Sequence, residues 1–103
     1  MILITGAAGK TGRAVIHALT DRGVDVRAWV RTTQQSAELR TLGVAETILG
    51  DLTDPAAWSF ALDDCTAVYH IAPNVHPAEV EIGQHLVTAA QRSAVELVAY
   101  HSV

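Results

Sequence analysis

Three glycines stand close together near the start of the chain, at positions 6, 9 and 12. They lie between a short apolar run, residues 2–5, and a segment with helical periodicity, residues 11–22. Glycines let an anion approach the backbone closely, and the free N–H groups at the start of a helix attract negative charge. Residues 5–12 therefore predict a loop that binds a pyrophosphate, with contacts from Gly6, Ala8, Gly9, Lys10, Thr11 and Gly12.

Two other interpretations of this loop are open. A nucleoside-triphosphate loop needs four residues between its glycines ahead of the lysine, whereas Gly6 and Gly9 are separated by only two. This spacing disfavours the triphosphate. The other interpretation is a tight turn that is rich in glycine for structural reasons alone. The strand before the loop and the helix after it favour the pyrophosphate.

Arg31 follows the second predicted strand, where a dinucleotide-binding fold holds the adenosine ribose. An acidic residue about 20 positions beyond the glycines usually binds a free 2′-hydroxyl, but residues 31–33 contain none. A guanidinium is the natural partner of a 2′-phosphate. The sequence thus favours NADP(H) over NAD(H) as the cofactor. The alternative is a solvated Arg31 without a ligand.

Further contacts to the cofactor are expected where the third and fourth strands end. Asp51 is placed to accept a hydrogen bond from the adenine amino group, with Leu52 against the ring. Asp51 as a turn-forming residue is equally consistent with the sequence. After the fourth strand, small and apolar residues leave room for the nicotinamide-side ribose: Ile71, Ala72 and Pro73, followed by Asn74.

Short apolar runs alternate with helical segments along the chain. The pattern predicts strands over residues 2–5, 24–30, 44–49, 66–71 and 96–100. It predicts helices over residues 11–22 and 34–42, a third that begins at Asp54-Pro55 and a fourth that begins at Pro77. Strict alternation with long connections predicts an α/β fold in one domain over residues 1–103, a doubly wound, Rossmann-like parallel sheet of order 3-2-1-4-5.

The residue pattern also predicts where one helix ends and which face of another is apolar. Gly23 stands where a glycine ends a helix, directly after the segment 11–22. In the fourth helix the residues that keep the apolar period are Val80, Gly83, Leu86, Val87 and Ala90.

Composition excludes several other classes of protein. Half of the residues are hydrophobic and the net charge is −4, without the clustered basic face that nucleic-acid binding requires. A single cysteine permits no internal disulfide, and the five histidines lack the spacing of a metal site. No signal peptide is evident, and no apolar stretch reaches the roughly 18 residues of a membrane span. We therefore expect a cytoplasmic protein without metal, nucleic-acid or membrane partners.

These features together resemble the short-chain dehydrogenase/reductase superfamily, and in particular its atypical NmrA-like branch of NADPH-dependent quinone reductases and redox-sensing regulators. The resemblance rests on residues 5–12, Val30-Arg31, Gly50-Asp51-Leu52 and His101-Ser102-Val103. It implies a pyrophosphate loop, an arginine on the 2′-phosphate and an Asp-Leu pair beside adenine. Members of this family continue well beyond the length of this chain, so we expect the first part of such a protein.

The resemblance also carries an expected reaction. Ser102 matches a serine that helps to orient a substrate carbonyl and is the expected catalytic residue, whereas the family's Tyr and Lys pair has no counterpart here. The implied activity is NADP(H)-dependent hydride transfer to a quinone or carbonyl. A non-catalytic NADP(H) sensor and a sugar-nucleotide epimerase are the alternatives; Arg31 speaks against the epimerase. The substrate stays open.

The fifth strand would form an exposed edge of the predicted sheet. Leu97, Val98 and Ala99 give it an apolar character, and exposed apolar edges pair with other chains. We therefore expect a homodimer or a domain-swapped assembly.

Overall fold

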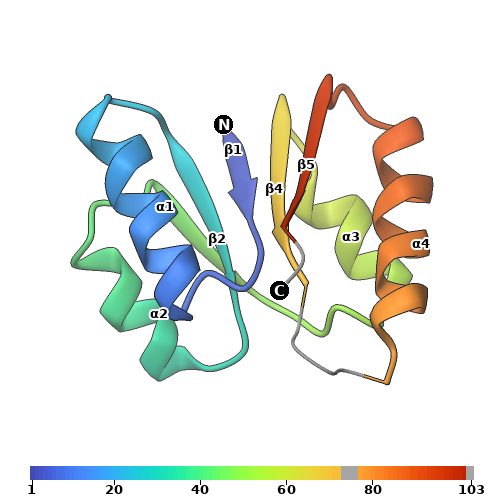
Figure 1. Ribbon diagram of the computed structural model, residues 1–103, viewed down its shortest axis with the longest axis horizontal. Helices are drawn as coiled ribbons and strands as arrows, with labels where there is room; N and C mark the ends of the chain where they lie inside the picture. Colours follow the sequence, from blue (N-terminus) through green and yellow to red (C-terminus); the bar gives the residue numbers. More distant parts are fainter. Residues whose placement is uncertain (73–76, 102–103) are drawn as a thin grey trace.

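The computed structural model describes residues 1–72 and 77–101, and within these residues five strands form one parallel sheet (Figure 1). The strands are β1 (Ile2–Ile4), β2 (Val26–Val30), β3 (Glu46–Leu49), β4 (Ala67–Ile71) and β5 (Leu97–His101). Their order is β3-β2-β1-β4-β5, and every neighbouring pair is parallel. The predicted fold class and strand order are thus confirmed.

The helices cover both faces of this sheet. They are α1 (Lys10–Asp21), α2 (Thr33–Arg40), α3 (Pro55–Ala61) and α4 (Glu79–Gln91). Helices α1 and α2 lie on one face, and α3 and α4 lie on the other (Figure 1). Element boundaries differ from the predicted ones by one or two residues at most ends, because helix and strand termini fray into the connecting loops.

Each face of the sheet has its own hydrophobic core. Adjacent residues of a strand point to opposite faces, so Leu3 packs with α3 and α4 whereas Ile4 packs with α1 and α2. On β2, alternate residues share one face, and Val26, Ala28 and Val30 lie in the core under α1 and α2. Because side chains of the central strands alternate in direction, each of these strands packs against the helices on both faces of the sheet.

Helix α1 ends and helix α3 begins at the capping residues that the sequence predicts. Gly23 follows the C-cap of α1 with a φ of 74°, its N–H donates to Thr20 O, and the Val24 N–H donates to Leu19 O. This is a Schellman motif, whose positive φ glycine adopts readily. At α3, Asp54 Oδ1 accepts a bond from the Ala56 N–H at 3.0 Å, and Pro55 occupies the first turn.

The buried face of α4 differs from the predicted apolar period. The structure buries Ile82, Leu86 and Ala89, whereas Val80 is 75% and Val87 55% exposed. Packing against the sheet and α3 selects the first set, although the second set has the same helical spacing. Helix α4 also begins two residues after Pro77.

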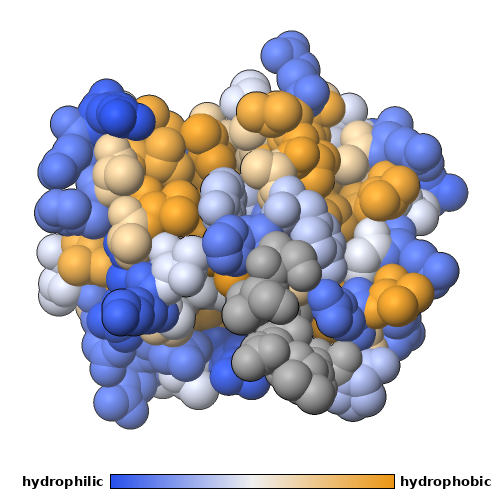
Figure 2. Space-filling model, in the orientation of Figure 1, coloured by the Kyte–Doolittle hydropathy of each residue, from blue (hydrophilic) through white to orange (hydrophobic). Residues whose placement is uncertain are grey.

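The exposed valines of α4 form part of an open apolar groove between α4 and β5. We call it the α4–β5 groove; it is lined by Val80, Gly83, Gln84, Leu86, Val87, Thr88, Val98 and Tyr100. Figure 2 shows apolar atoms at the surface over both elements. None of the helices in the described part of the chain is long and apolar enough to cross a membrane.

Candidate dinucleotide-binding site

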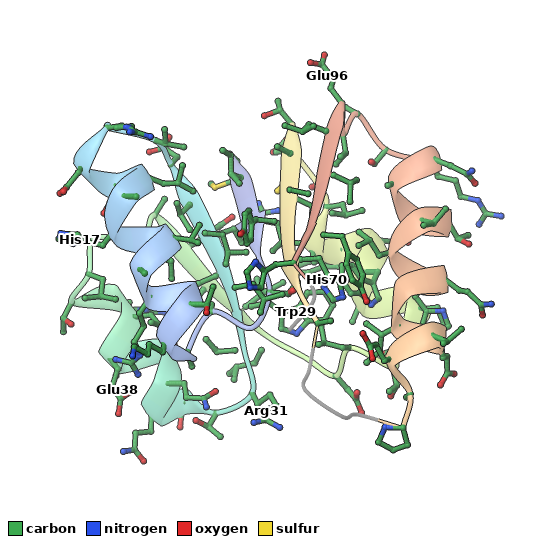
Figure 3. All side chains as sticks on the ribbon, in the orientation of Figure 1. His17, Trp29, Arg31, Glu38, His70 and Glu96 are labelled. Atoms are coloured by element: carbon green, nitrogen blue, oxygen red, sulfur yellow. The ribbon has the colours of Figure 1, made fainter. Side chains whose placement is uncertain are left out.

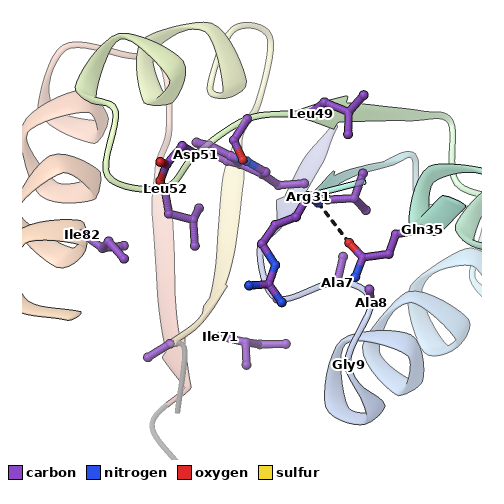
Figure 4. A pocket seen from close by; sticks show the side chains of 15 residues that line it. Ala7, Ala8, Gly9, Arg31, Gln35, Leu49, Asp51, Leu52, Ile71 and Ile82 are labelled. Carbon is purple, nitrogen blue, oxygen red and sulfur yellow. Dashed lines mark hydrogen bonds between the residues drawn. The ribbon is translucent and has the colours of Figure 1, made fainter. Parts of the chain in front are cut away.

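A cavity of about 1130 Å³ lies at the carboxyl edge of the sheet. Its walls come from the carboxyl ends of strands, from the segments that follow them and from two helices. The lining residues are Gly6, Ala7, Ala8, Gly9, Trp29, Val30, Arg31, Gln35, Leu49, Gly50, Asp51, Leu52, Ile71, Ala72 and Ile82 (Figure 4). Strand β1 pairs with β2 on one side and β4 on the other, so the chain turns in opposite directions there. Open α/β sheets bind their ligands at such switch points.

The loop after β1 is a tight backbone turn that leads into α1. Gly6 has a φ of 60°, and its carbonyl accepts a bond from the Gly9 N–H at 3.2 Å. Gly9 is the N-cap of α1 and supplies no side-chain acceptor for the first turn. Helix N–H groups without internal partners are donors for an anion.

Packing constrains two of the three loop glycines. A Cβ on Gly6 would lie 2.9 Å from Ile71 Cβ, and one on Gly12 would lie 2.3 Å from Gly6 O and 2.7 Å from Ala7 Cα. A Cβ on Gly9 would meet only Gly6 O, at 3.5 Å. Gly6 and Gly12 are therefore needed by the protein itself, and Gly12 packs α1 onto the loop. At Gly9 the described residues leave room for a Cβ.

A buried polar pair fastens β1 to β4 directly before this loop. Thr5 Oγ1 accepts a bond from the Ile71 N–H at 3.1 Å and lies 2.7 Å from Nδ1 of His70. Burial lowers the pKa of His70 to about 4, and the nearby Glu79 charge only partly opposes this. The neutral imidazole therefore accepts the Thr5 hydroxyl proton at Nδ1, because the reverse arrangement would leave that hydroxyl proton unbonded.

His70 is fully buried (Figure 3). Its ring centroid lies 5.7 Å from that of Trp58 and 5.2 Å from that of Tyr100. Nε2 of His70 has no hydrogen-bond partner among the described residues. The bond between His70 and Thr5 depends on the β1–β4 register, which no local sequence pattern encodes.

Arg13 connects the glycine loop with α2. Its Nε donates to Ala8 O at 2.9 Å, and its Nη2 donates to Glu38 Oε2 at 2.7 Å. The bond from Arg13 lowers the pKa of Glu38. The negative charge of Glu38 is thus paired outside the cavity, since Glu38 is not among the lining residues.

Arg31 lies where β2 ends, and its side chain projects into the cavity toward the glycine loop (Figure 4). The Arg31 N–H donates to Gln35 Oε1 at 3.0 Å. Its guanidinium has no hydrogen bond or ion pair with any residue that the structure describes. An exposed cation inside a cavity is available to bind an anion.

Asp51 and Leu52 also line the cavity, and two indoles hold the segment that carries them. Trp29 Nε1 donates to Gly50 O at 2.9 Å, and Trp58 Nε1 donates to Leu52 O at 2.8 Å. Asp51 Oδ1 accepts bonds from both N and Oγ1 of Thr53. Asp51 is thus a turn former that at the same time faces the cavity.

The predicted site residues fall into three groups. Gly6, Ala8, Gly9, Arg31, Asp51, Leu52, Ile71 and Ala72 line the cavity. Lys10, Thr11 and Gly12 lie in the first turn of α1 without lining it. Pro73, Asn74 and Ser102 lie outside the described residues.

Sequence reasoning missed several lining residues, among them Gln35 and Ile82. A place in the first turn of the helix after β2 is the one local signal that points to Gln35. The described residues contain no group of three metal-binding side chains.

Known proteins share this architecture. Residues 6–103 match a family described as NAD(P)H-binding. The chain is 33% identical over 100 residues to the 4-hydroxy-2-methyl-3-oxo-4-farnesyl-3,4-dihydroquinoline-1-oxide ketoreductase of Stigmatella aurantiaca, an alignment that covers 88% of this chain and 29% of the relative.

Two solved structures illustrate the structural match. The NADPH-dependent quinone oxidoreductase QOR2 of Escherichia coli, complexed with NADPH, is 28% identical with a TM-score of 0.84, over 97% of this chain and 36% of that one. A short-chain dehydrogenase/reductase superfamily protein of Agrobacterium tumefaciens with bound NAD is 33% identical with a TM-score of 0.72, over 97% and 31%.

The chain spans about a third of the length of these proteins. Within that part, fold and sequence agree with the resemblance that the glycine loop predicts. The chain belongs to the NAD(P)H-binding family and carries the Rossmann-like cofactor fold of the short-chain dehydrogenase/reductase and NmrA-like oxidoreductases.

Proposed function

We propose that this chain is the NADP(H)-binding part of a reductase that transfers hydride to a carbonyl or quinone. The Stigmatella relative is a ketoreductase and the Escherichia coli protein is a quinone oxidoreductase, which supports this reaction class. The bound cofactor supplies the hydride. The chain's own residues bind it, orient it and hold it at the carboxyl edge of the sheet.

The orientation of the cofactor follows from the chemistry of the cavity walls. The free N–H groups in the first turn of α1, at Lys10, Thr11 and Gly12, bind the pyrophosphate. The adenosine half of the cofactor then lies on the Arg31 side of the cavity. Asp51 and Leu52 then face the adenine. The apolar side chains of Ile71 and Ile82 border the opposite, nicotinamide half. Ser102, which lies outside the described residues, is the residue proposed to act on the substrate carbonyl.

The observation that supports a preference for NADP(H) is the unpaired guanidinium of Arg31 in the cavity. A cofactor with a free 2′-hydroxyl needs an acceptor at this place, whereas a 2′-phosphate needs donors and positive charge. The solved structures include both an NADPH complex and an NAD complex, so the fold alone does not select the cofactor. Arg31 selects the phosphate.

Titration with NADPH and NADH, followed by nicotinamide fluorescence, tests this proposal. The chain should bind NADPH more tightly, and Arg31→Ala should weaken NADPH about tenfold to a hundredfold, as expected for a charged hydrogen bond. NADH binding should change little. Arg22→Ala, which removes the same charge at the far end of α1, is the matched control. A preference for NADH, or an equal loss for both cofactors, would contradict the proposal.

A further inference from the structure

We propose that Gln35 is a second, specificity-determining donor for the 2′-phosphate, beside Arg31. This inference rests on the proposed NADP(H) site. Gln35 lies in the first turn of α2 and lines the cavity with Arg31 and the glycine loop (Figure 4). Gln35 is half-buried, and a hydrogen bond from the Arg31 N–H holds its amide oxygen.

A backbone bond fixes which end of the Gln35 amide faces the ligand. Gln35 Oε1 accepts the Arg31 N–H at 3.0 Å, which identifies that atom as the oxygen. The Nε2 group is left with its two N–H donors, and none of the described residues accepts from it. The same bond places this amide next to the residue that supplies the guanidinium.

The carboxylates near Gln35 are bonded to other residues, so the groups that face a ligand in this part of the cavity are hydrogen-bond donors. Glu38, one turn further along α2, is bound by Arg13 at 2.7 Å and by Gln34 Nε2 at 3.4 Å. Asp51, the one carboxylate among the described lining residues, belongs to the segment after β3 and accepts two bonds from Thr53. A 2′-phosphate would therefore meet a cation and an amide N–H here.

The isosteric variant Gln35→Glu separates this role from a structural one. One carboxylate oxygen still accepts the Arg31 N–H, so the turn between β2 and α2 is kept. The other oxygen replaces the donor with a charged acceptor, which repels phosphate and accepts from a ribose hydroxyl.

We expect the ratio of the NADPH and NADH dissociation constants to shift by about tenfold or more toward NADH. The same shift is expected between adenosine 2′,5′-bisphosphate and adenosine 5′-phosphate, which differ only in the 2′-phosphate. Both measurements are binding titrations and need no turnover.

Gln34→Glu is the matched control, because it adds the same charge to the neighbouring residue, which does not line the cavity. It should move either ratio by less than about threefold, as expected for a solvent-exposed and screened charge. Melting curves of both variants check that the fold is intact.

The possible outcomes distinguish a failure of the proposed function from a failure of the proposed role of Gln35. If the unaltered chain binds neither dinucleotide, the proposed function fails. If it prefers NADPH but Gln35→Glu leaves the ratio within about twofold, a change too small for a charged hydrogen bond, only the role of Gln35 fails. Equal weakening of both ligands would make Gln35 a structural support of Arg31 and would overturn the inference.

Discussion

The Thr5–His70 pair places a neutral histidine in the core, directly before the ligand loop. Its imidazole accepts a bond only while it is uncharged, and burial holds its pKa at about 4, below the ordinary 6.5. Since the unfolded chain binds the proton first as the pH falls, the folded state loses stability between about pH 6.5 and 4.

His70 should therefore lower the free energy of unfolding by about 3 kcal/mol across this pH range, because each pKa unit corresponds to about 1.4 kcal/mol. Urea denaturation at a series of pH values measures the slope. In His70→Asn the amide oxygen can still accept from Thr5 without titrating, so the slope should flatten.

His17→Asn, at an exposed position of α1, is the control and should leave the slope of the original chain unchanged. A parallel decline of all three proteins with pH would contradict this assignment to His70.

The positions of single residues at the cavity were predictable from sequence where they follow from the end of a strand. Arg31 and Asp51 are such residues, because the carboxyl edge of a parallel sheet is where ligands bind. Gln35 and the Thr5–His70 bond were not, since each depends on a contact that only the folded backbone creates. The sequence thus predicted which charged residues lie at the cavity, but it did not predict the hydrogen bonds around them.

At the scale of elements, helix α1 and the glycine loop pack closely against each other. The absent Cβ of Gly12 lets the first turn of α1 lie against the carbonyl of Gly6. Gly9 takes no part in this packing. The two glycines should therefore respond differently to the same substitution.

Gly12→Ala should lower the free energy of unfolding by about 1–3 kcal/mol, the usual cost of overpacking, and should abolish tight dinucleotide binding. Gly9→Ala should cost no more than about 1 kcal/mol, because its backbone angles suit alanine, while its Cβ still obstructs the pyrophosphate. Denaturation curves and NADPH titrations on the two variants check this. Equal destabilisation of both would contradict the packing argument.

Strands and helix ends were predictable because local chemistry determines them. Gly23 and the Asp54-Pro55 pair act through their own backbone preferences. The buried face of α4 was not predictable, because two sets of apolar residues share its period and only packing distinguishes them. Val80 and Val87 were left outside.

For the whole molecule, β5 is an edge with an apolar surface. Among the described residues β5 pairs only with β4, and Leu97 is 64% and Val98 42% exposed. The α4–β5 groove extends this surface. Such an edge is a template for another strand, so this chain is predicted to self-associate as a homodimer.

Val98→Lys should weaken this self-association about tenfold or more, because a charge on an apolar edge opposes strand pairing. Size-exclusion chromatography with light scattering, over a range of protein concentrations, measures it. Leu49→Lys, on β3 at the opposite edge of the sheet, is the matched control. A monomer at every concentration would contradict the prediction.

The central position of β1 affects how the nascent chain folds during its synthesis. Strand β1 is made well before β4, which is one of its two neighbours in the sheet; Thr5 and His70 lie 65 positions apart. At ordinary translation speeds of about 5–20 residues per second, β1 stays half-paired for roughly 3–13 s. During that time the cavity lacks the Ile71 side chain that lines it, so the proposed dinucleotide is expected to bind only after β4 has been made.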